Sequence, residues 1–285
     1  MSKPLLIDGA MGTELNIRGV STPLPLWSAE ANIQNSKIVL DIHKDYIESG
    51  SRVITTNTFR TTPWTYKKAG YSDKKSKEAA RSSLYKAVDI AHKASEKDVL
   101  IAGSITSVDD CYRPLSFPGL SIAEENYGYL VDWLVDAGVD LLLFETMGNI
   151  IEINCALNIA KNYELPKWLS IIFDDYCNLL DGTKVENLFA EIDKKSLECL
   201  LTNCNTKKLT LEGLKKIRRI WSGSVGAYPN LGLTNYENDY FKVIDQTSLL
   251  NCLKALIEQE LDIIGLCCGS TPYHVSLLNA LIEDN

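Results

Sequence analysis

The sequence predicts a single (β/α)8 barrel, and three observations lead to this fold class. Eight short runs of apolar, β-prone residues recur along the 285 residues. Stretches with the apolar spacing of amphipathic helices lie between them. Composition nowhere shifts in a way that would mark a linker. We therefore expect one domain over residues 1–285, with a doubly wound open sheet as the alternative.

The expected strands and helices alternate from one end of the chain to the other. The strands are Leu5–Asp8, Val53–Asn57, Val99–Ser104, Leu141–Glu145, Leu169–Phe173, Cys199–Asn203, Ser224–Tyr228 and Ile263–Cys267. The helices are Lys37–Glu48, Ala79–Ala94, Ala123–Asp136, Ile150–Asn162, Leu209–Ile220, Ser248–Glu260 and Pro272–Ile282. Gly50, Gly70 and Gly138 stand where helices should end, and Thr271-Pro272 is typical of a helix start.

Charge and hydropathy exclude several classes of protein. The formal net charge is −8, with 29 basic and 37 acidic residues, so a basic surface for nucleic acid is not expected. The longest apolar runs are too short to cross a membrane. Asp8 interrupts the N-terminal region before a signal-peptide core can form. We expect a cytoplasmic protein with small-molecule partners, and the sequence carries no signal for its oligomeric state.

The eight cysteines divide into two groups. Without an export signal a disulfide framework is not expected. Cys155, Cys177, Cys199 and Cys252 have apolar neighbours and should be small buried hydrophobes. Cys204, Cys267 and Cys268 instead lie at the ends of expected strands.

The C-terminal ends of barrel strands build the active site of this fold. Here those ends carry two isolated carboxylates, Asp8 and Glu145, together with the three thiols. Adjacent strand residues face opposite ways, so Cys267 and Cys268 can share one ion only where the chain leaves the strand, and Gly265 and Gly269 allow that departure. Three thiolates and one open position are typical of a catalytic zinc.

Other zinc arrangements are disfavoured. No Cys-x-x-Cys pair occurs, which argues against a local zinc knuckle. His43, His92 and His274 lie in predicted helices away from the strand ends, so we expect none of them to be a ligand.

The motifs together resemble the homocysteine S-methyltransferase family, in order from about residue 5 to residue 280. The pattern Asn203-Cys204 with Cys267-Cys268-Gly269-Ser270-Thr271-Pro272 is the most specific part. Further matches are residues 8–15 (DGAMGTEL), 26–29 (LWSA), 55–59 (TTNTF), 181–183 (DGT) and 228–230 (YPN). The resemblance implies a zinc-dependent barrel that methylates homocysteine to methionine.

The resemblance also implies roles for individual residues. Cys204, Cys267 and Cys268 would hold Zn²⁺, and Asn230 would take its fourth position when substrate is absent. Asp8 and Glu145 would bind the amino group of homocysteine. Backbone N–H groups near Asn57 and Thr58 are candidates for its carboxylate. Trp27, Phe59 and Tyr112 are candidates for a cation–π wall around the donor.

The expected chemistry follows from charge. Binding to the metal removes the proton of a thiol that is otherwise mostly protonated at neutral pH. Three cysteine thiolates leave a Zn²⁺ centre with one negative charge, and the acceptor sulfur adds another. Such a centre favours a cationic methyl donor, either a sulfonium or a quaternary ammonium.

Departures from the family pattern bear on the donor. Arg60 stands where betaine-using relatives have an aromatic residue, and residues 106–114 replace a glycine-rich segment. S-methylmethionine or S-adenosylmethionine is therefore favoured over betaine, with dimethylsulfoniopropionate as a further alternative. Arg60 or Arg113 would receive a donor carboxylate, unless Arg60 lies on the solvated rim. The segment Asp109–Arg113 has no assigned role.

Two alternative functions stay open at this point. One is methyl transfer to another thiol or to a selenol such as that of selenocysteine. The other, from a different class, is a non-catalytic zinc- or redox-responsive barrel in which Cys267 and Cys268 are oxidised.

Overall fold

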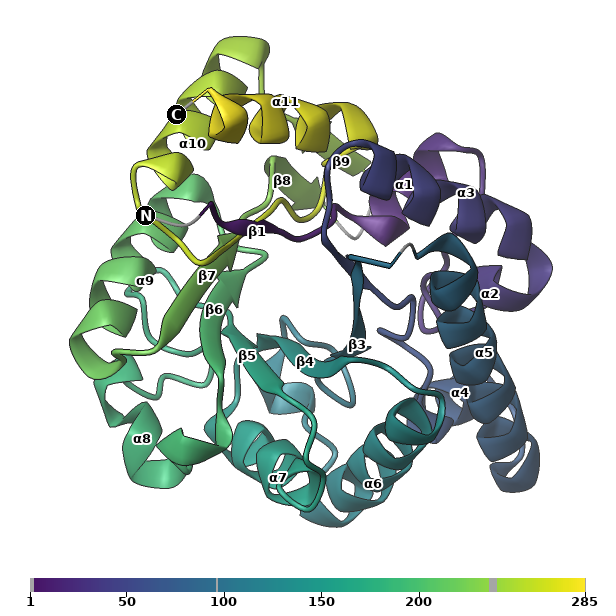
Figure 1. The fold of residues 1–285 in the computed structure, drawn as a ribbon. Coiled ribbons are helices and arrows are strands. Elements are labelled where there is room, and N and C mark those ends of the chain that lie inside the picture. Colours follow the sequence, from purple (N-terminus) through teal and green to yellow (C-terminus); the bar gives the residue numbers. More distant parts are fainter. Residues whose placement is uncertain (1–2, 96, 236–239, 285) are drawn as a thin grey trace.

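The computed structural model describes residues 3–95, 97–235 and 240–284, with the side chains of residues 233–242 outside the description. Eight parallel strands surround a central axis and helices surround the strands (Figure 1). The strand order is β1-β10-β7-β6-β5-β4-β3-β2. A parallel bridge from Ile7 to Val53 joins β1 to β2, so the sheet closes. The predicted barrel is confirmed.

The barrel strands match the expected runs to within a few residues. They are β1 (Leu5–Leu6), β2 (Val53–Thr55), β3 (Leu100–Ile105), β4 (Leu141–Met147), β5 (Lys167–Ile171), β6 (Cys199–Asn203), β7 (Ser224–Tyr228) and β10 (Ile263–Ile264). An antiparallel pair, β8 (Gly232–Asn235) with β9 (Tyr240–Val243), follows β7. This pair was not among the strands expected from the sequence.

The longer helices lie where the apolar periodicity predicts them. They are α3 (Ser36–Glu48), α5 (Asp73–Ala94), α6 (Leu120–Asp136), α7 (Ile150–Ala160), α9 (Lys207–Ile220), α10 (Gln246–Ile257) and α11 (Pro272–Glu283). Four short helices were not predicted, namely α1 (Met11–Ile17), α2 (Ala31–Gln34), α4 (Pro63–Lys68) and α8 (Leu188–Glu191). Helix α5 begins at Asp73, earlier than expected. Its first turns are polar and solvent-facing, so they carry no apolar periodicity from which the start could be predicted.

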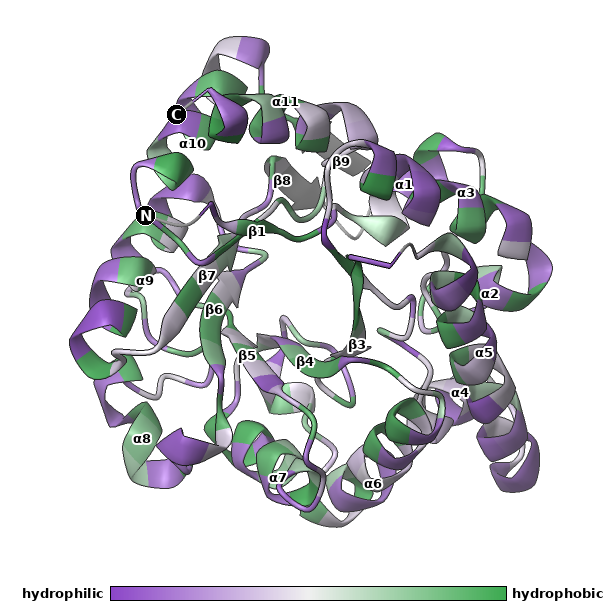
Figure 2. Ribbon diagram, viewed as in Figure 1, coloured by the Kyte–Doolittle hydropathy of each residue, from purple (hydrophilic) through white to green (hydrophobic). Residues whose placement is uncertain are grey.

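The apolar residues form two layers separated by the strands. One layer fills the barrel, with Ile7, Leu143, Trp168 and Leu201 among its members. The larger layer lies between the strands and the helices. The strands are accordingly largely hydrophobic in Figure 2, whereas the helices alternate between hydrophobic and hydrophilic faces. Alternation of side chains along each strand supplies both layers.

The two glycines beside Cys267 and Cys268 act differently from one another. Gly269 has φ +83°, a conformation that favours glycine and lets the chain turn after the cysteines. The expectation that Gly265 also helps the chain to leave the strand is wrong, because this residue does not have a positive φ. A Cβ there would lie 2.2 Å from Cγ2 of Ile7, so glycine is needed for the approach of β1 to β10.

Cysteine burial agrees with the expectation. Cys155, Cys177, Cys199 and Cys252 are buried, whereas Cys204, Cys267 and Cys268 are only partly buried. Among the described residues, no helix is both long and apolar enough to cross a membrane.

We predict that His43 makes the fold acid-sensitive. This residue of α3 is fully buried and, within the described residues, neither ring nitrogen has a hydrogen-bond partner. Burial lowers its pKa from 6.5 to about 4. Between these pH values His43 therefore carries a proton in the unfolded chain but not in the folded chain. The contribution of His43 to the free energy of unfolding, fully present above pH 6.5, should therefore fall by about 3 kcal/mol as the pH drops toward 4.

Urea unfolding at several pH values tests this prediction. His43→Leu should flatten the fall in unfolding free energy between pH 6.5 and 4. The exposed residue His92 provides the control, because His92→Leu should leave the slope unchanged. Identical slopes for wild type and His43→Leu would show that His43 is not the responsible group.

Candidate metal centre and active-site cavity

The three predicted cysteines meet at the mouth of the barrel. Sγ of Cys204 lies 2.7 Å from Sγ of Cys267, and Sγ of Cys267 lies 4.0 Å from Sγ of Cys268. All three sulfurs are within 4.8 Å of one another. Cys204 comes from the end of β6 and the other two from the segment after β10. Because β7 alone separates β6 from β10, the sheet order brings the thiols together.

Asn203 positions the first thiol. Cys204 has φ +54°, which is unusual for a residue with a side chain. The fully buried amide of Asn203 donates from Nδ2 to Oγ1 of Thr146 at 2.8 Å and to Sγ of Cys204 at 3.3 Å. Its Oδ1 accepts from Ser170 Oγ at 2.7 Å and from the Thr146 N–H at 2.9 Å. One side chain therefore connects β4, β5 and β6 beneath the sulfur.

Asn230 ties the two cysteine segments together through the main chain. Its Nδ2 donates to the carbonyl oxygen of Cys204 at 2.9 Å, and its Oδ1 accepts from the N–H of Cys268 at 3.2 Å. In this conformation both ends of the amide are engaged with backbone. The side chain thus sets the spacing of Cys204 and Cys268.

The sulfur cluster fits a tetrahedral thiophilic ion. Sulfurs bound at about 2.3 Å around such an ion lie about 3.8 Å apart, close to the spacing of Cys267 and Cys268. Cys204 and Cys267 are closer than this and would separate around an ion. Without one, hydrogen bonds to Cys204 and Cys268, followed by burial, raise the pKa of the Cys267 thiol well above its usual value. A cation is the group that would allow all three to ionise together.

The two predicted carboxylates lie deep in the same barrel mouth. Asp8 is 4% exposed and accepts from Thr55 N–H at 2.8 Å. Glu145 accepts from the hydroxyls of Ser104 and, at 3.2 Å, Tyr228. Loss of solvent raises the pKa of Asp8 well above its usual value and that of Glu145 to about 7. Among the described residues neither carboxylate forms an ion pair, so a cationic ligand would stabilise both.

The thiols and carboxylates line one cavity of about 450 Å³. The predicted ligand-binding residues Trp27, Asn57 and Phe59 line it, as do Tyr112, Arg60 and Arg113. Arg60 is only 9% exposed, so the solvated-rim alternative is wrong.

Thr58 does not line this cavity. Its hydroxyl donates to the carbonyl oxygen of Ser104 at 2.6 Å and its N–H to the carbonyl oxygen of Thr56 at 2.8 Å. Thr58 therefore shapes the loop after β2, and its N–H is already occupied. The side chain of Asn57 is likewise engaged, with Ser28 and Asn32.

Several residues of the site were not assigned roles from the sequence. Two of them form hydrogen bonds to Sγ of Cys204, namely Asn203 and Thr146, and two to the carboxylate of Glu145, namely Ser104 and Tyr228. In the sequence, the signal for these roles was their position at the ends of strands. Cys111 is a further thiol in the cavity lining, and burial raises its pKa to about 12. It belongs to a loop, and nothing in its neighbours distinguishes it from the other buried cysteines.

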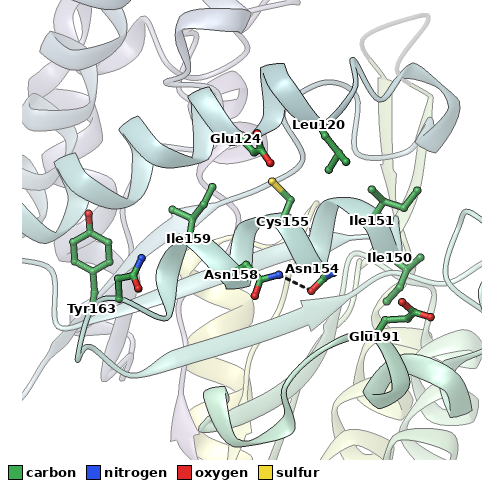
Figure 3. A pocket seen from close by; sticks show the side chains of 11 residues that line it. Leu120, Glu124, Ile150, Ile151, Asn154, Cys155, Asn158, Ile159, Tyr163 and Glu191 are labelled. Atoms are coloured by element: carbon green, nitrogen blue, oxygen red, sulfur yellow. Dashed lines mark hydrogen bonds between the residues drawn. The ribbon is translucent and has the colours of Figure 1, made fainter.

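A second hollow of about 550 Å³ lies on the outside of the barrel, between α6 and α7 (Figure 3). Its lining combines Leu120, Ile151 and Ile159 with asparagines, and Asn158 donates to Asn154 at 2.9 Å. Its two acids and one thiol, Glu124, Glu191 and Cys155, do not form a group that could hold a metal ion, whereas the three cysteines of the barrel mouth are such a group among the described residues. The chemically equipped cavity is therefore the one at the strand ends.

The fold and the thiol cluster define a barrel enzyme with a candidate metal site at its mouth. The family model described as homocysteine S-methyltransferase matches residues 5–282. The chain therefore belongs to the homocysteine S-methyltransferase family of enzymes, as the motifs predicted.

Individual relatives agree with this assignment. The chain is 27% identical to homocysteine S-methyltransferase of Escherichia coli, over 97% of this chain and 94% of that protein. It is 24% identical to selenocysteine methyltransferase of Astragalus bisulcatus, over 95% of this chain and 94% of that protein. The crystal structure of the E. coli homocysteine methyltransferase MmuM in its metallated form superposes with a TM-score of 0.83 at 26% identity, covering 98% of this chain and 96% of that one.

We predict that the thiol cluster binds one metal ion per chain. Cys267→Ser should abolish stoichiometric metal in the purified, folded protein, because two thiols do not complete the site. Elemental analysis per chain is the measurement. Cys155→Ser, which changes a buried thiol in the outer hollow, should retain the metal. Full occupancy in Cys267→Ser would refute the assignment.

Proposed function

We propose that this protein is a zinc-dependent methyltransferase that transfers a methyl group from a cationic donor to the sulfur of homocysteine, giving methionine. The observation that carries the proposal is that three convergent thiols share one cavity with the buried Asp8 and the half-buried Glu145, neither of which forms an ion pair with a described residue. A thiol amino acid needs both features, one for its sulfur and one for its ammonium group.

Cys204, Cys267 and Cys268 would hold the zinc ion. When bound, zinc supplies a Lewis-acidic centre that keeps an acceptor thiol ionised at neutral pH. The similarity to a homocysteine methyltransferase whose structure has been determined in a metallated form supports a metal ion at this site, and the three thiolate ligands favour zinc. Asn230 and Asn203 keep the three sulfurs in place through the contacts described above.

Asp8 and Glu145 bind the ammonium group of the acceptor. They reach the cavity from β1 and β4, on different sides of the barrel. Hydrogen bonds from Thr55 orient the carboxylate oxygens of Asp8, and those from Ser104 and Tyr228 orient the oxygens of Glu145. A cation between them offsets the cost of burying the carboxylates. This contact orients the acceptor sulfur toward the thiol cluster.

Methyl transfer is a single in-line displacement. The electron pair of the acceptor sulfur forms the new S–CH3 bond while the bond from the methyl group to the donor breaks. The electron pair of the broken bond stays on the donor atom, which thereby loses its positive charge. No general base is needed at carbon, so the cavity acts by positioning and by excluding water. Trp27 and Phe59 offer aromatic faces to the donor cation.

The donor we favour is a sulfonium amino acid, S-methylmethionine or S-adenosylmethionine. Support comes from the cavity lining, where the guanidinium of Arg60 lies over the ring of Phe59, 5.4 Å from its centroid. A compact quaternary ammonium such as betaine would meet this cation beside the aromatic face. Parallel assays with these donors and dimethylsulfoniopropionate, read out as methionine, test the ranking. Fastest turnover with betaine would overturn it.

The acceptor is tested in the same assay. We expect homocysteine to be preferred over selenocysteine, although a relative is a selenocysteine methyltransferase. The measurement is kcat/KM for each acceptor at a saturating donor concentration. Preference for selenocysteine would change the substrate but preserve the proposed chemistry.

We predict that Asp8→Asn and Glu145→Gln weaken homocysteine binding without loss of metal. Removing one partner of a buried charge pair should cost about 2–5 kcal/mol. Binding of 4-mercaptobutyrate, which lacks the amino group, should change far less. Glu124→Gln, in the outer hollow, is the matched control. Equal losses with homocysteine and the amino-free thiol would exclude a role in ammonium recognition.

A further inference from the structure

Arg60 is a buried cation with an unused hydrogen-bond donor. It belongs to the loop between β2 and α4, is 9% exposed, and lines the cavity that holds the thiols. Its Nε has no hydrogen-bond partner within the described residues. A buried guanidinium nitrogen without a partner is costly, and most such groups in folded proteins are satisfied.

The loop that follows β3 holds this guanidinium in place without neutralising it. One terminal nitrogen of Arg60 donates to the main-chain oxygen of Asp109. The carboxylate of Asp109 is engaged elsewhere, by Trp64 Nε1 at 2.9 Å and by Lys68 Nζ at 2.7 and 2.9 Å. Arg60 forms no salt bridge with a described residue. Its charge therefore remains available to a ligand.

These contacts suit the recognition of a carboxylate. A guanidinium presents its donors in a planar fork that matches the two oxygens of a carboxylate. The ring of Phe59 covers one face of the fork and orients it. The ion pair between Lys68 and Asp109 then acts as a brace, because it fixes the loop whose carbonyl oxygen holds Arg60.

The position of Arg60 favours the donor over the acceptor. In homocysteine the ammonium and the carboxylate are attached to one carbon, so both must lie beside Asp8 and Glu145. The hydrogen bonds of those two acids are to Thr55, Ser104 and Tyr228, which belong to the barrel strands. The contacts of Arg60 are instead with Phe59 and Asp109, on loops beyond the strand ends.

We propose that Arg60 binds the carboxylate of the methyl donor and that Lys68 and Asp109 position it. The ligand class is a sulfonium that carries a carboxylate several bonds from its reactive methyl group. This proposal rests on the methyltransferase function proposed above and adds to it a binding subsite for the donor. It also assigns a role to the start of the Asp109–Arg113 segment.

Comparison of two donors tests the role of Arg60. Wild type and Arg60→Gln are assayed with S-methylmethionine and with trimethylsulfonium, which has no carboxylate. Arg60→Gln should raise KM for S-methylmethionine by about 30-fold or more, as expected for loss of a buried charge pair. KM for homocysteine should remain near wild type, and kcat/KM for trimethylsulfonium should not fall, because this donor has no carboxylate to lose and is repelled by the guanidinium. Arg60→Lys should recover part of the loss, which also controls for misfolding.

Substitution of Lys68 tests whether its ion pair with Asp109 positions Arg60. Lys68→Met should raise KM for S-methylmethionine less than Arg60→Gln does, leave kcat unchanged, and be rescued by Lys68→Arg. The neighbouring Lys67, which pairs with Asp73 outside the cavity, provides the matched control, and Lys67→Met should behave as wild type. A fall in kcat with both donors after Lys68→Met would contradict a positioning role.

Calorimetric binding of S-methylmethionine to the metal-loaded protein separates this proposal from the proposed function. Binding that depends on Arg60 without any methyl transfer would support the subsite and refute the function. If wild type and Arg60→Gln transfer a methyl group from S-methylmethionine equally well, the function would be supported and the subsite refuted. A raised KM for homocysteine, or equal losses with both donors, would also overturn the subsite.

Discussion

Closure of the sheet between β1 and β2 is the constraint on which the site depends. The N–H of Asp8 donates to the carbonyl oxygen of Val53 at 2.9 Å, and the N–H of Arg52 donates to that of Leu6 at 2.8 Å. On its other side β1 packs against β10, where only a glycine at residue 265 leaves room for Ile7. Without this closure Asp8 would not lie opposite Glu145, and the thiols would have no shared cavity with the carboxylates.

The closed barrel separates charge within that cavity. The sulfurs and carboxylates at the strand ends are acidic groups with little solvent, whereas the nearby buried cation, Arg60, comes from the outer loops. In the proposed reaction, the ammonium group of the acceptor would therefore be bound inside the barrel, and the carboxylate of the donor would be bound at its entrance. Under the proposed function, both sulfur atoms would then lie between these two regions, where an in-line displacement requires them.

The elements with regular periodicity were predictable from sequence, and the irregular ones were not. Helices such as α3 and α9 carry an apolar stripe that the burial of one face requires. The short helices α2 and α8 have only one turn, too short for any periodicity to be read. The β8–β9 pair and the loop carrying Asp109 depend on contacts with other parts of the fold, and such contacts leave no local pattern in the sequence.

The sequence by itself determined the fold class, through the alternation of strands and helices, and the family, through its motifs. It also placed three thiols and two carboxylates at strand ends, and the strand ends of a closed barrel converge on one face. Only the tertiary structure decided how these groups are held. Asn203 under Cys204, Asn230 between the cysteine segments and Asp109 behind Arg60 all act through hydrogen bonds between residues distant in sequence. Burial likewise came from the tertiary structure, since the exposure of Arg60 depends on loops that pack over it rather than on its neighbours along the chain.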